Sequence, residues 1–175
     1  MVRAARETDP LERMKLVSSF ILGGLHVMPK ICKSKAPLNP VLGETYQAHK
    51  KDGCSIFLEQ TSHHPPTSNF LMLGPEKCFE IIGFAETVAK MTGLNSIKGY
   101  REGKSIIKFK DGTLMTWLCP EMIITGVLLG DRMINFAGQY VIKDYQNKIE
   151  STITFPFKVK DFYDLYNVMI RIRFT

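Results

Sequence analysis

Two adjacent histidines, His63 and His64, are the residues whose type and spacing most clearly suit binding chemistry. They stand directly before Pro65 and Pro66 and follow the apolar run 56–58. A residue before proline is biased toward an extended backbone, so the pair is displayed on stiff chain. Two imidazoles offer two ring N–H donors, and a nearby anion favours their protonated form. The pair therefore suits a phosphate group better than a metal.

Other uses of this histidine pair have less support in the sequence. A metal site commonly uses His at i and i+4 of a helix or Cys-x-x-Cys pairs, and neither spacing occurs here. A nucleophilic site needs an orienting carboxylate and a nucleophile that the sequence does not locate. We therefore expect no catalytic residue, no metal and no cofactor. On the residues alone, two histidines in an ordinary surface loop remain an alternative.

A second motif, KAPLNPVLGETY, occupies residues 35–46. Each proline fixes its own φ and moves the preceding residue out of the α region. Asn39 is thus held extended between Pro37 and Pro40. A local Asx-type hydrogen bond within a loop is the alternative for Asn39.

The elements that must position both motifs are one helix and a sheet. Apolar residues at three- and four-residue spacing predict an amphipathic helix over about 11–27, with Asp9-Pro10 as its N-cap and first position. Short turns then separate strand-like runs, which predicts antiparallel neighbours and hence a meander. The apolar stretch 122–129 should be covered on both faces. Strands are predicted at 44–49, 55–61, 69–73, 79–88, 105–110, 114–119, 122–127, 133–142 and 150–155.

Composition limits the protein class. A chain of 175 residues that is 45% hydrophobic fits one domain. The longest apolar stretch, 16–28, is too short and too polar to span a bilayer, and the N-terminus lacks the pattern of a secretory signal. Four widely spaced cysteines favour reduced thiols, and we expect a cytoplasmic protein. The net charge of +6 favours an anionic partner, which leaves a membrane surface, a phosphorylated headgroup or nucleic acid open.

The motif EQTSHHPP at 59–66 resembles the signature of the oxysterol-binding-protein-related family of lipid-transfer proteins. Residues 36–46 resemble a second block of that family, and weaker similarity covers most of 14–160. The resemblance implies a mainly β (α+β) fold with an N-terminal helix, in which an antiparallel meander forms part of a large incomplete β-barrel around a lipid tunnel. Residues 1–175 are then a single partial domain, truncated on its C-terminal side, with the sheet over about 44–157.

The resemblance also implies a function. Members exchange a sterol or phosphatidylserine for phosphatidylinositol 4-phosphate, so we expect lipid transfer, peripheral contact with anionic membranes and no enzyme activity. His63, His64, Asn39 and Lys35 are expected to hold the headgroup. Ala36 stands where the family usually has Lys; Lys35 is the nearest replacement but points to the other side of an extended segment, so reduced phosphoinositide affinity is expected. The candidate tunnel wall, for which an ordinary core role is the alternative, comprises Leu38, Phe57, Phe70, Met72 and Ile124.

Two rival functions remain. The first is a cytosolic module that binds an apolar ligand without exchange. The second is a basic β-barrel that binds nucleic acid, for which only the net charge argues. Such a barrel should interleave aromatic residues with Lys and Arg on one exposed face, and the strand-rich segments lack that pattern, so no nucleic acid partner is expected.

Overall fold

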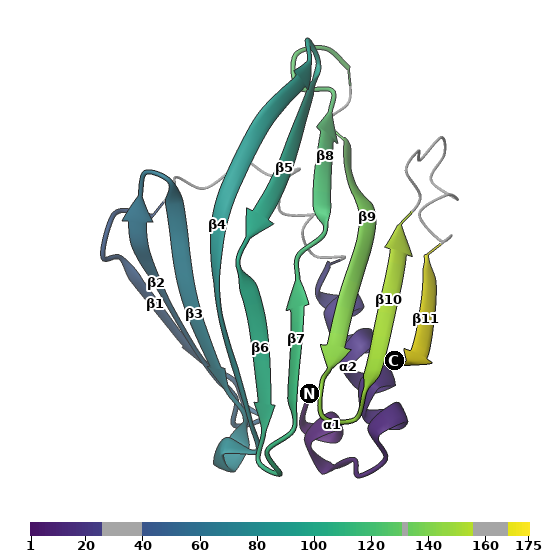
Figure 1. The fold of residues 1–175 in the computed structure, drawn as a ribbon. Coiled ribbons are helices and arrows are strands. Elements are labelled where there is room, and N and C mark those ends of the chain that lie inside the picture. The colour runs from purple at the N-terminus through teal and green to yellow at the C-terminus, as the bar shows by residue number, and fades with distance from the viewer. Residues whose placement is uncertain (26–39, 131–132, 156–167) are drawn as a thin grey trace.

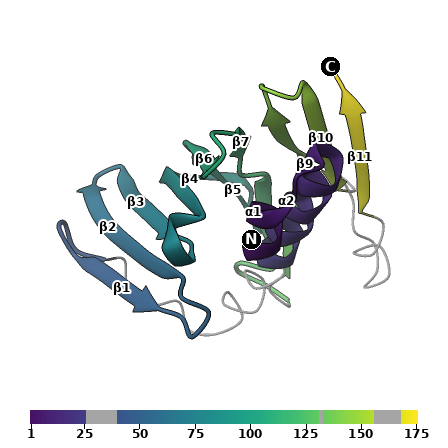
Figure 2. The ribbon, with the colours of Figure 1, turned by 90° about the horizontal axis from the view of Figure 1, so that it is seen from below.

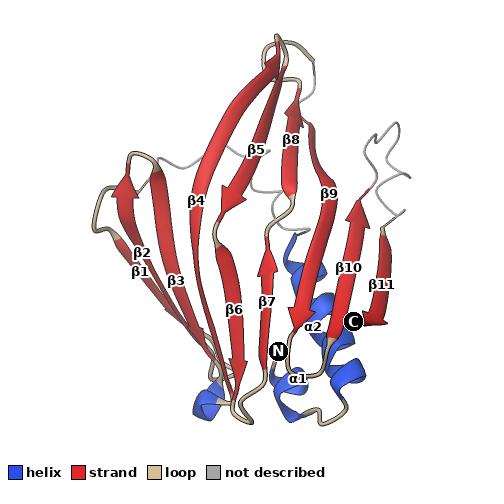
Figure 3. Cartoon of the chain, in the orientation of Figure 1, coloured by secondary structure: helices blue, strands red, loops and turns tan. Residues whose placement is uncertain are grey.

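The computed structural model describes residues 1–25, 40–130, 133–155 and 168–175. Within these residues, two helices precede an antiparallel sheet of 11 strands (Figures 1 and 3). The helices are α1 (Val2–Arg6) and α2 (Pro10–Leu25), and a short 3-10 turn, η1, spans Pro75–Lys77. The strands are β1 (Thr45–His49), β2 (Ser55–His63), β3 (Pro66–Leu73), β4 (Phe79–Gly93), β5 (Ser96–Glu102), β6 (Lys104–Phe109), β7 (Leu114–Leu118), β8 (Glu121–Thr125), β9 (Met133–Asp144), β10 (Ile149–Phe155) and β11 (Met169–Phe174).

Helix α2 begins where the sequence predicts it. The Asp9 Oδ1 atom accepts a hydrogen bond from the Glu12 N–H at 2.9 Å, which is an N-cap interaction, and Pro10 takes the first helical position. The described part of the helix ends at Leu25, and the last two residues of the predicted range lie outside the described chain. The shorter α1 was not predicted.

The predicted meander is confirmed. Strand β4 pairs with β6 along its first half and with β5 along its second, and β9 is likewise shared between β8 and β7. Strands β5 and β6 are therefore two parts of one long strand, as are β7 and β8. Each long strand then pairs with its neighbours in the sequence. The sheet stays open, with β1 and β11 at its edges, so the described strands form no closed barrel.

Three details of the strand prediction were wrong. Strand β5 was missed because Gly99 at its centre and the charged Lys98 and Arg101 hide the usual strand pattern. Strand β11 extends the sheet beyond the predicted limit near 157. Strand β8 ends at Thr125, and Leu128 and Leu129 beyond it are 68% and 79% exposed, so the expected cover on both faces is lacking there.

The two faces of the sheet have different roles. Figure 2 shows the sheet curving around α1 and α2. We call the face toward these helices the inner face and the opposite one the outer face. Cross-strand neighbours share a face, and one buried inner row crosses the sheet from β4 to β10. This row consists of Ile81, Ile107, Met115, Asp144 and Ile149.

A buried arginine fastens the helices to the sheet. Arg13 of α2 is 5% exposed, and its guanidinium lies 4.8 Å from the centroid of the Phe109 ring. The same group is 2.6 Å from the Asp111 carboxylate, donates to the Thr113 hydroxyl at 2.9 Å and donates to the Glu7 carbonyl oxygen. One side chain thus joins α2, the segment before it and the β6–β7 turn.

A β-bulge with a glycine interrupts the pairing at the centre of the sheet. Lys104 pairs with Leu118, and Gly99 pairs with Met122. Gly99 and Lys104 are five residues apart, whereas their partners are four apart, so the β5–β6 strand holds one residue more than β7–β8 in this interval. Gly103 lies in that interval with φ of 124°, a conformation that favours glycine. A Cβ at Gly103 would lie 2.2 Å from the backbone oxygen of Phe84. The bulge therefore requires glycine at this position for two reasons.

Replacing Gly103 should be costly because the substitution adds both backbone strain and a steric clash. We expect Gly103→Ala to lower the free energy of unfolding by roughly 2–4 kcal/mol in urea titrations. Gly112→Ala is the matched control, since Gly112 has φ of 92° but a Cβ there would meet nothing within 4 Å. It should lose only about 1 kcal/mol. Equal losses in the two variants would contradict the steric explanation.

The ion pair at the β6–β7 turn should make stability fall in acid. Partial burial raises the pKa of Asp111, but hydrogen bonds from the Thr113 N–H and from Arg13 outweigh it, and the pKa is lowered overall. The contribution of ionised Asp111 to the free energy of unfolding is therefore complete above the pKa of about 3.9 that the residue has in the unfolded chain. This contribution is lost as the pH falls through the lower pKa of the folded state. We expect Asp111→Asn to show a smaller drop in urea midpoint between about pH 4 and 2 than the parent or than Glu102→Gln, an exposed carboxylate control. Identical acid profiles would contradict this.

Candidate functional site

The histidine pair lies at the tip of the β2–β3 hairpin. His63 ends β2, His64 and Pro65 form the turn, and Pro66 begins β3. Both histidines are exposed, and their ring centroids are 4.7 Å apart in an edge-to-face arrangement with an interplanar angle of 65°. Two imidazoles this close can both contact one phosphate-sized anion.

A β-bulge decides which way this tip faces. The register between β2 and β3 shifts between Gln60 and Ser62, so Thr61 is an extra residue. Before the bulge Gln60 pairs with Ser68, and after it His63 pairs with Pro66, which shares a face with Ser68. His63 consequently stands on the inner face, whereas an uninterrupted strand would have placed it on the outer face.

Polar side chains hold the bulge in place. Gln60 is 3% exposed; its amide nitrogen donates to the Ser62 carbonyl at 2.9 Å, and its amide oxygen accepts from the Ser68 hydroxyl. On the opposite side, Asn69 donates to the Thr61 hydroxyl at 2.6 Å. The backbone that carries the histidines is therefore fixed by hydrogen bonds rather than by apolar packing alone.

The Pro-rich motif reaches the same corner of the sheet. Asn39, Lys35 and Leu38 lie outside the described residues, so their positions stay predictions. The motif's later part is described: the Gly43 N–H donates to the Gln60 carbonyl at 2.8 Å, and the Gln60 N–H donates to the Glu44 carbonyl at 3.0 Å. Gly43 is thus hydrogen-bonded to Gln60, which precedes His63 by three residues, and this bond brings the two sequence motifs together.

The predicted wall residues do not all share one face. Phe70 pairs with Gly83 and Met72 with Ile81, which puts both on the inner face. Ile124 alternates with Met122, whose partner Phe136 packs against the buried Phe155 at 5.6 Å, so Ile124 is also on the inner face. Phe57 instead pairs with Gln47 and Leu71 and faces outward, so it does not belong to the same wall as the other three.

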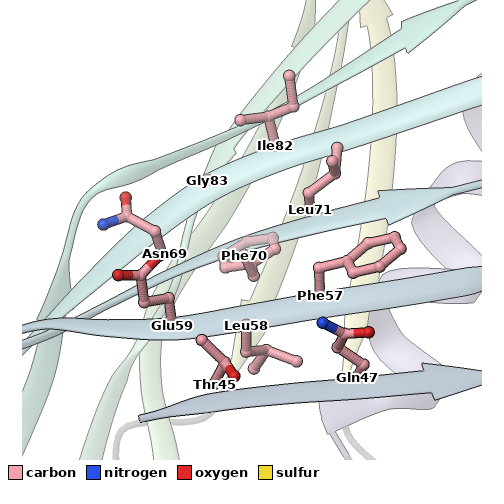
Figure 4. Close-up of a pocket in the computed structure, with 10 residues that line it drawn as sticks. All are labelled: Thr45, Gln47, Phe57, Leu58, Glu59, Asn69, Phe70, Leu71, Ile82 and Gly83. Atoms are coloured by element: carbon pink, nitrogen blue, oxygen red, sulfur yellow. The ribbon is translucent and has the colours of Figure 1, made fainter. Parts of the chain in front are cut away.

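A pocket of about 400 Å³ lies on that outer side and includes Phe57 (Figure 4). Its rim is polar at Thr45, Gln47, Glu59 and Asn69. This pocket is open to solvent and lies on the face away from the helices, so it is not the predicted tunnel. The apolar surface near the histidines is the part of the inner face that belongs to β1–β3. In Figure 2 the helices lie over other strands and do not cover this part. All of its residues are at least partly exposed: Tyr46, Ile56, Leu58, Phe70 and Met72.

Arg101 is a basic residue near this surface that sequence patterns did not reveal. Thr67 pairs with Glu86, and the next residue of β4, Thr87, pairs with Arg101, so the register continues the row of His63 and Pro66 toward Arg101. It was missed because it belongs to β5, the unpredicted strand. Arg101 also influences the Cys119 thiol. Burial raises the pKa of Cys119, and Arg101 and Tyr140 lower it by less, so the thiol is uncharged at neutral pH.

These features define a mainly β protein with an open sheet that curves around N-terminal helices and carries a polar hairpin beside an apolar inner surface. The family model described as Oxysterol-binding protein matches residues 1–173, and the chain belongs to this family. None of the helices in the described ranges is long and apolar enough to span a membrane.

Relatives and solved structures agree with this membership. Oxysterol-binding protein 9 of Dictyostelium discoideum is 39% identical over 155 residues, which is 88% of this chain and 35% of that protein. Oxysterol-binding protein homolog 6 of Saccharomyces cerevisiae is 32% identical over 86% of this chain and 36% of its own length. The Osh1 ORD domain in complex with cholesterol superposes with a TM-score of 0.84 at 25% identity, covering 97% of this chain and 40% of that one. The chain thus spans little more than a third of these relatives.

The buried amide beneath the histidine turn provides a test of how the tip is held. Gln60→Met keeps the volume but removes two hydrogen bonds, so we expect a loss of about 1–2 kcal/mol in unfolding free energy. The His63 and His64 ring signals should also shift in NMR spectra. Gln47→Met, on the exposed outer face of β1, is the control. Unmoved histidine signals in the Gln60 variant would show that the tip does not depend on this network.

Proposed function

We propose that this chain binds a membrane lipid along its inner face and carries it between membranes. The lipid body lies against the inner apolar surface of β1–β3, and its headgroup phosphate meets His63 and His64 at the hairpin tip. Asn39 and Lys35 add headgroup contacts from the Pro-rich motif. Phe70, Met72 and Ile124, together with Leu38, line the apolar path, and Arg101 adds positive charge to it. The proposal includes no catalytic step, no cofactor and no nucleic acid partner.

The observation that carries this proposal is the bulge at Thr61, which places His63 on the same face as Phe70 and Met72. A lipid needs this combination, because its hydrocarbon body gains about 25 cal/mol per Å² of apolar surface withdrawn from water. Its phosphate requires hydrogen-bond donors at the boundary of that surface. A histidine pair on the outer face would offer the donors without the apolar wall.

The ligands of similar solved structures support the choice of lipid. The Osh1 ORD domain has been solved with cholesterol and with ergosterol, and the Osh3 ORD of Saccharomyces cerevisiae with PI(4)P. The Osh3 domain superposes with a TM-score of 0.79 at 27% identity over 92% of this chain. We infer that a sterol or phosphatidylserine is exchanged here for phosphatidylinositol 4-phosphate, at anionic membranes that attract a chain of charge +6.

Binding without exchange is the second candidate function. It is favoured by the open sheet, since β1 and β11 are both unpaired edges among the described strands. A chain of this kind would extract a lipid from a membrane and retain it.

The histidine pair should control phosphoinositide binding. We expect His63→Ala with His64→Ala to weaken binding of phosphatidylinositol 4-phosphate vesicles by about 10- to 100-fold, since a charge-assisted hydrogen bond contributes about 1.5–3 kcal/mol. His49→Ala is the matched control, because His49 is an exposed histidine of β1 that contacts Phe57 on the outer face. Vesicle co-sedimentation gives the affinity. Equal binding by the parent and the double variant would remove the headgroup assignment.

Exchange is tested with donor and acceptor liposomes that carry a fluorescent sterol or phosphatidylserine, with phosphatidylinositol 4-phosphate in the acceptor. Transfer above the spontaneous rate that is lost in the double histidine variant supports exchange. Extraction from donor liposomes without delivery assigns the chain to the second candidate function. Failure to extract any lipid would contradict both.

A further inference from the structure

A second pocket, which is cationic, lies on the outer face at the far end of the sheet from the histidine tip. It has a volume of about 300 Å³ and is formed by β9, β10 and β11. Three cross-strand rows build it. These rows are Lys143–Glu150–Arg173, Val141–Thr152–Arg171 and Gln139–Thr154–Met169.

The floor of the pocket is ordered by one carboxylate. Glu150 is 8% exposed and accepts from the Arg173 guanidinium at 2.9 Å, while the Lys143 ammonium lies 3.5 Å from its other oxygen. The Thr152 hydroxyl also donates to Glu150, at 3.4 Å. Burial raises the pKa of Glu150, but its bonds with Arg173 and its proximity to Lys143 lower the pKa overall, so the carboxylate is ionised at neutral pH. Both Arg173 and Lys143 are thus held in place.

The other cation of the pocket, Arg171, has an exposed side chain. This side chain makes no ion pair or hydrogen bond with the residues that the structure describes. Its cross-strand neighbour is Thr152, and Thr154 and Gln139 supply further polar groups beside it. Glu150 is the one acidic residue among the described residues that line the pocket, and Arg171 and Arg173 are its two cations. Lys143, which pairs with Glu150 beside the pocket, adds a third positive charge, so the pocket and Lys143 together carry two excess positive charges.

We propose that this pocket binds a phosphomonoester dianion, with Arg171 as its principal ligand. A phosphomonoester carries about 1.5–2 negative charges at neutral pH, which matches the excess charge of the pocket and the adjoining Lys143. The planar guanidinium of Arg171 can donate two parallel hydrogen bonds to phosphate oxygens, and the Thr154 hydroxyl can donate to another, while the Thr152 hydroxyl stays directed at Glu150. The volume of about 300 Å³ accommodates a small phosphorylated group. This site is independent of the proposed lipid function, because inner and outer side chains of the same strands point away from each other.

The test uses the full chain with His63→Ala and His64→Ala, so that the first anion site cannot contribute. Two probes separate the possible sources of the phosphomonoester. Glycerol 3-phosphate, followed by 31P NMR, represents a soluble compound, and vesicles with phosphatidic acid represent a lipid headgroup. Vesicles with phosphatidylglycerol at the same fraction are the control, because its phosphodiester carries one charge.

We expect Arg171→Gln to weaken binding of the responsive probe at least about tenfold, and Thr154→Val to weaken it about threefold. Arg3→Gln, which removes an exposed arginine from α1, is the matched control for net charge and should leave the affinity unchanged. If either probe binds, and if Arg171→Gln and Thr154→Val weaken its binding while Arg3→Gln does not, the result supports the pocket. The probe that binds then shows whether the phosphomonoester is a soluble compound or a lipid headgroup. The proposal is overturned if neither probe binds, if Arg171→Gln binds as tightly as its parent, or if Arg3→Gln is equally weakened. Should Arg171→Gln fail to fold, the Thr154 variant decides in the same way.

Discussion

The strict alternation of side chains along a strand is the constraint on which this molecule depends. One inserted residue moves every later side chain to the opposite face. The bulge at Thr61 uses this rule to place His63 on the inner face. The positive-φ glycines Gly103 and Gly138 lie in the central strands where the pairing register changes by one residue. The facing of the histidine tip and the register of the central strands are both set by where these single residues are inserted.

A curved sheet must also cover its inner face, and the chain does so unevenly. Helices α1 and α2 pack over the middle of the sheet and toward β10, where Arg13 and the buried Ser18–Ser151 hydrogen bond of 2.8 Å fix them. Strands β1–β3 receive no such cover from the described helices, although their inner side chains are largely apolar. The fold therefore places its own hydrophobic packing at one end of the inner face and leaves apolar surface on β1–β3 partly exposed, where the proposed lipid would lie.

The sequence alone predicted the features that are determined by residues close together in the chain. The Asp9-Pro10 cap, the turn signals of the meander and the display of His63 and His64 all depend on neighbouring residues. What it missed depends on pairing register, which is a property of two strands together. Phe57 was assigned to the tunnel wall by its type, yet its partners turn it outward. Arg101 was overlooked because Gly99 hides strand β5, although that strand continues the row of the histidine tip.

The same alternation explains how one thin sheet can carry the two proposed anion sites on opposite faces. In β10, Ser151 and Ile153 point inward and are buried against the helix side, while Glu150, Thr152 and Thr154 point outward into the cationic pocket. The outer cations therefore lie across the sheet from a dry inner layer rather than beside the histidines. Charge on the outer face is screened by solvent, within a Debye length of about 8 Å at physiological salt. An anion at the proposed outer site would leave the inner face free for the proposed lipid, so a single layer of strands would separate the two proposed sites.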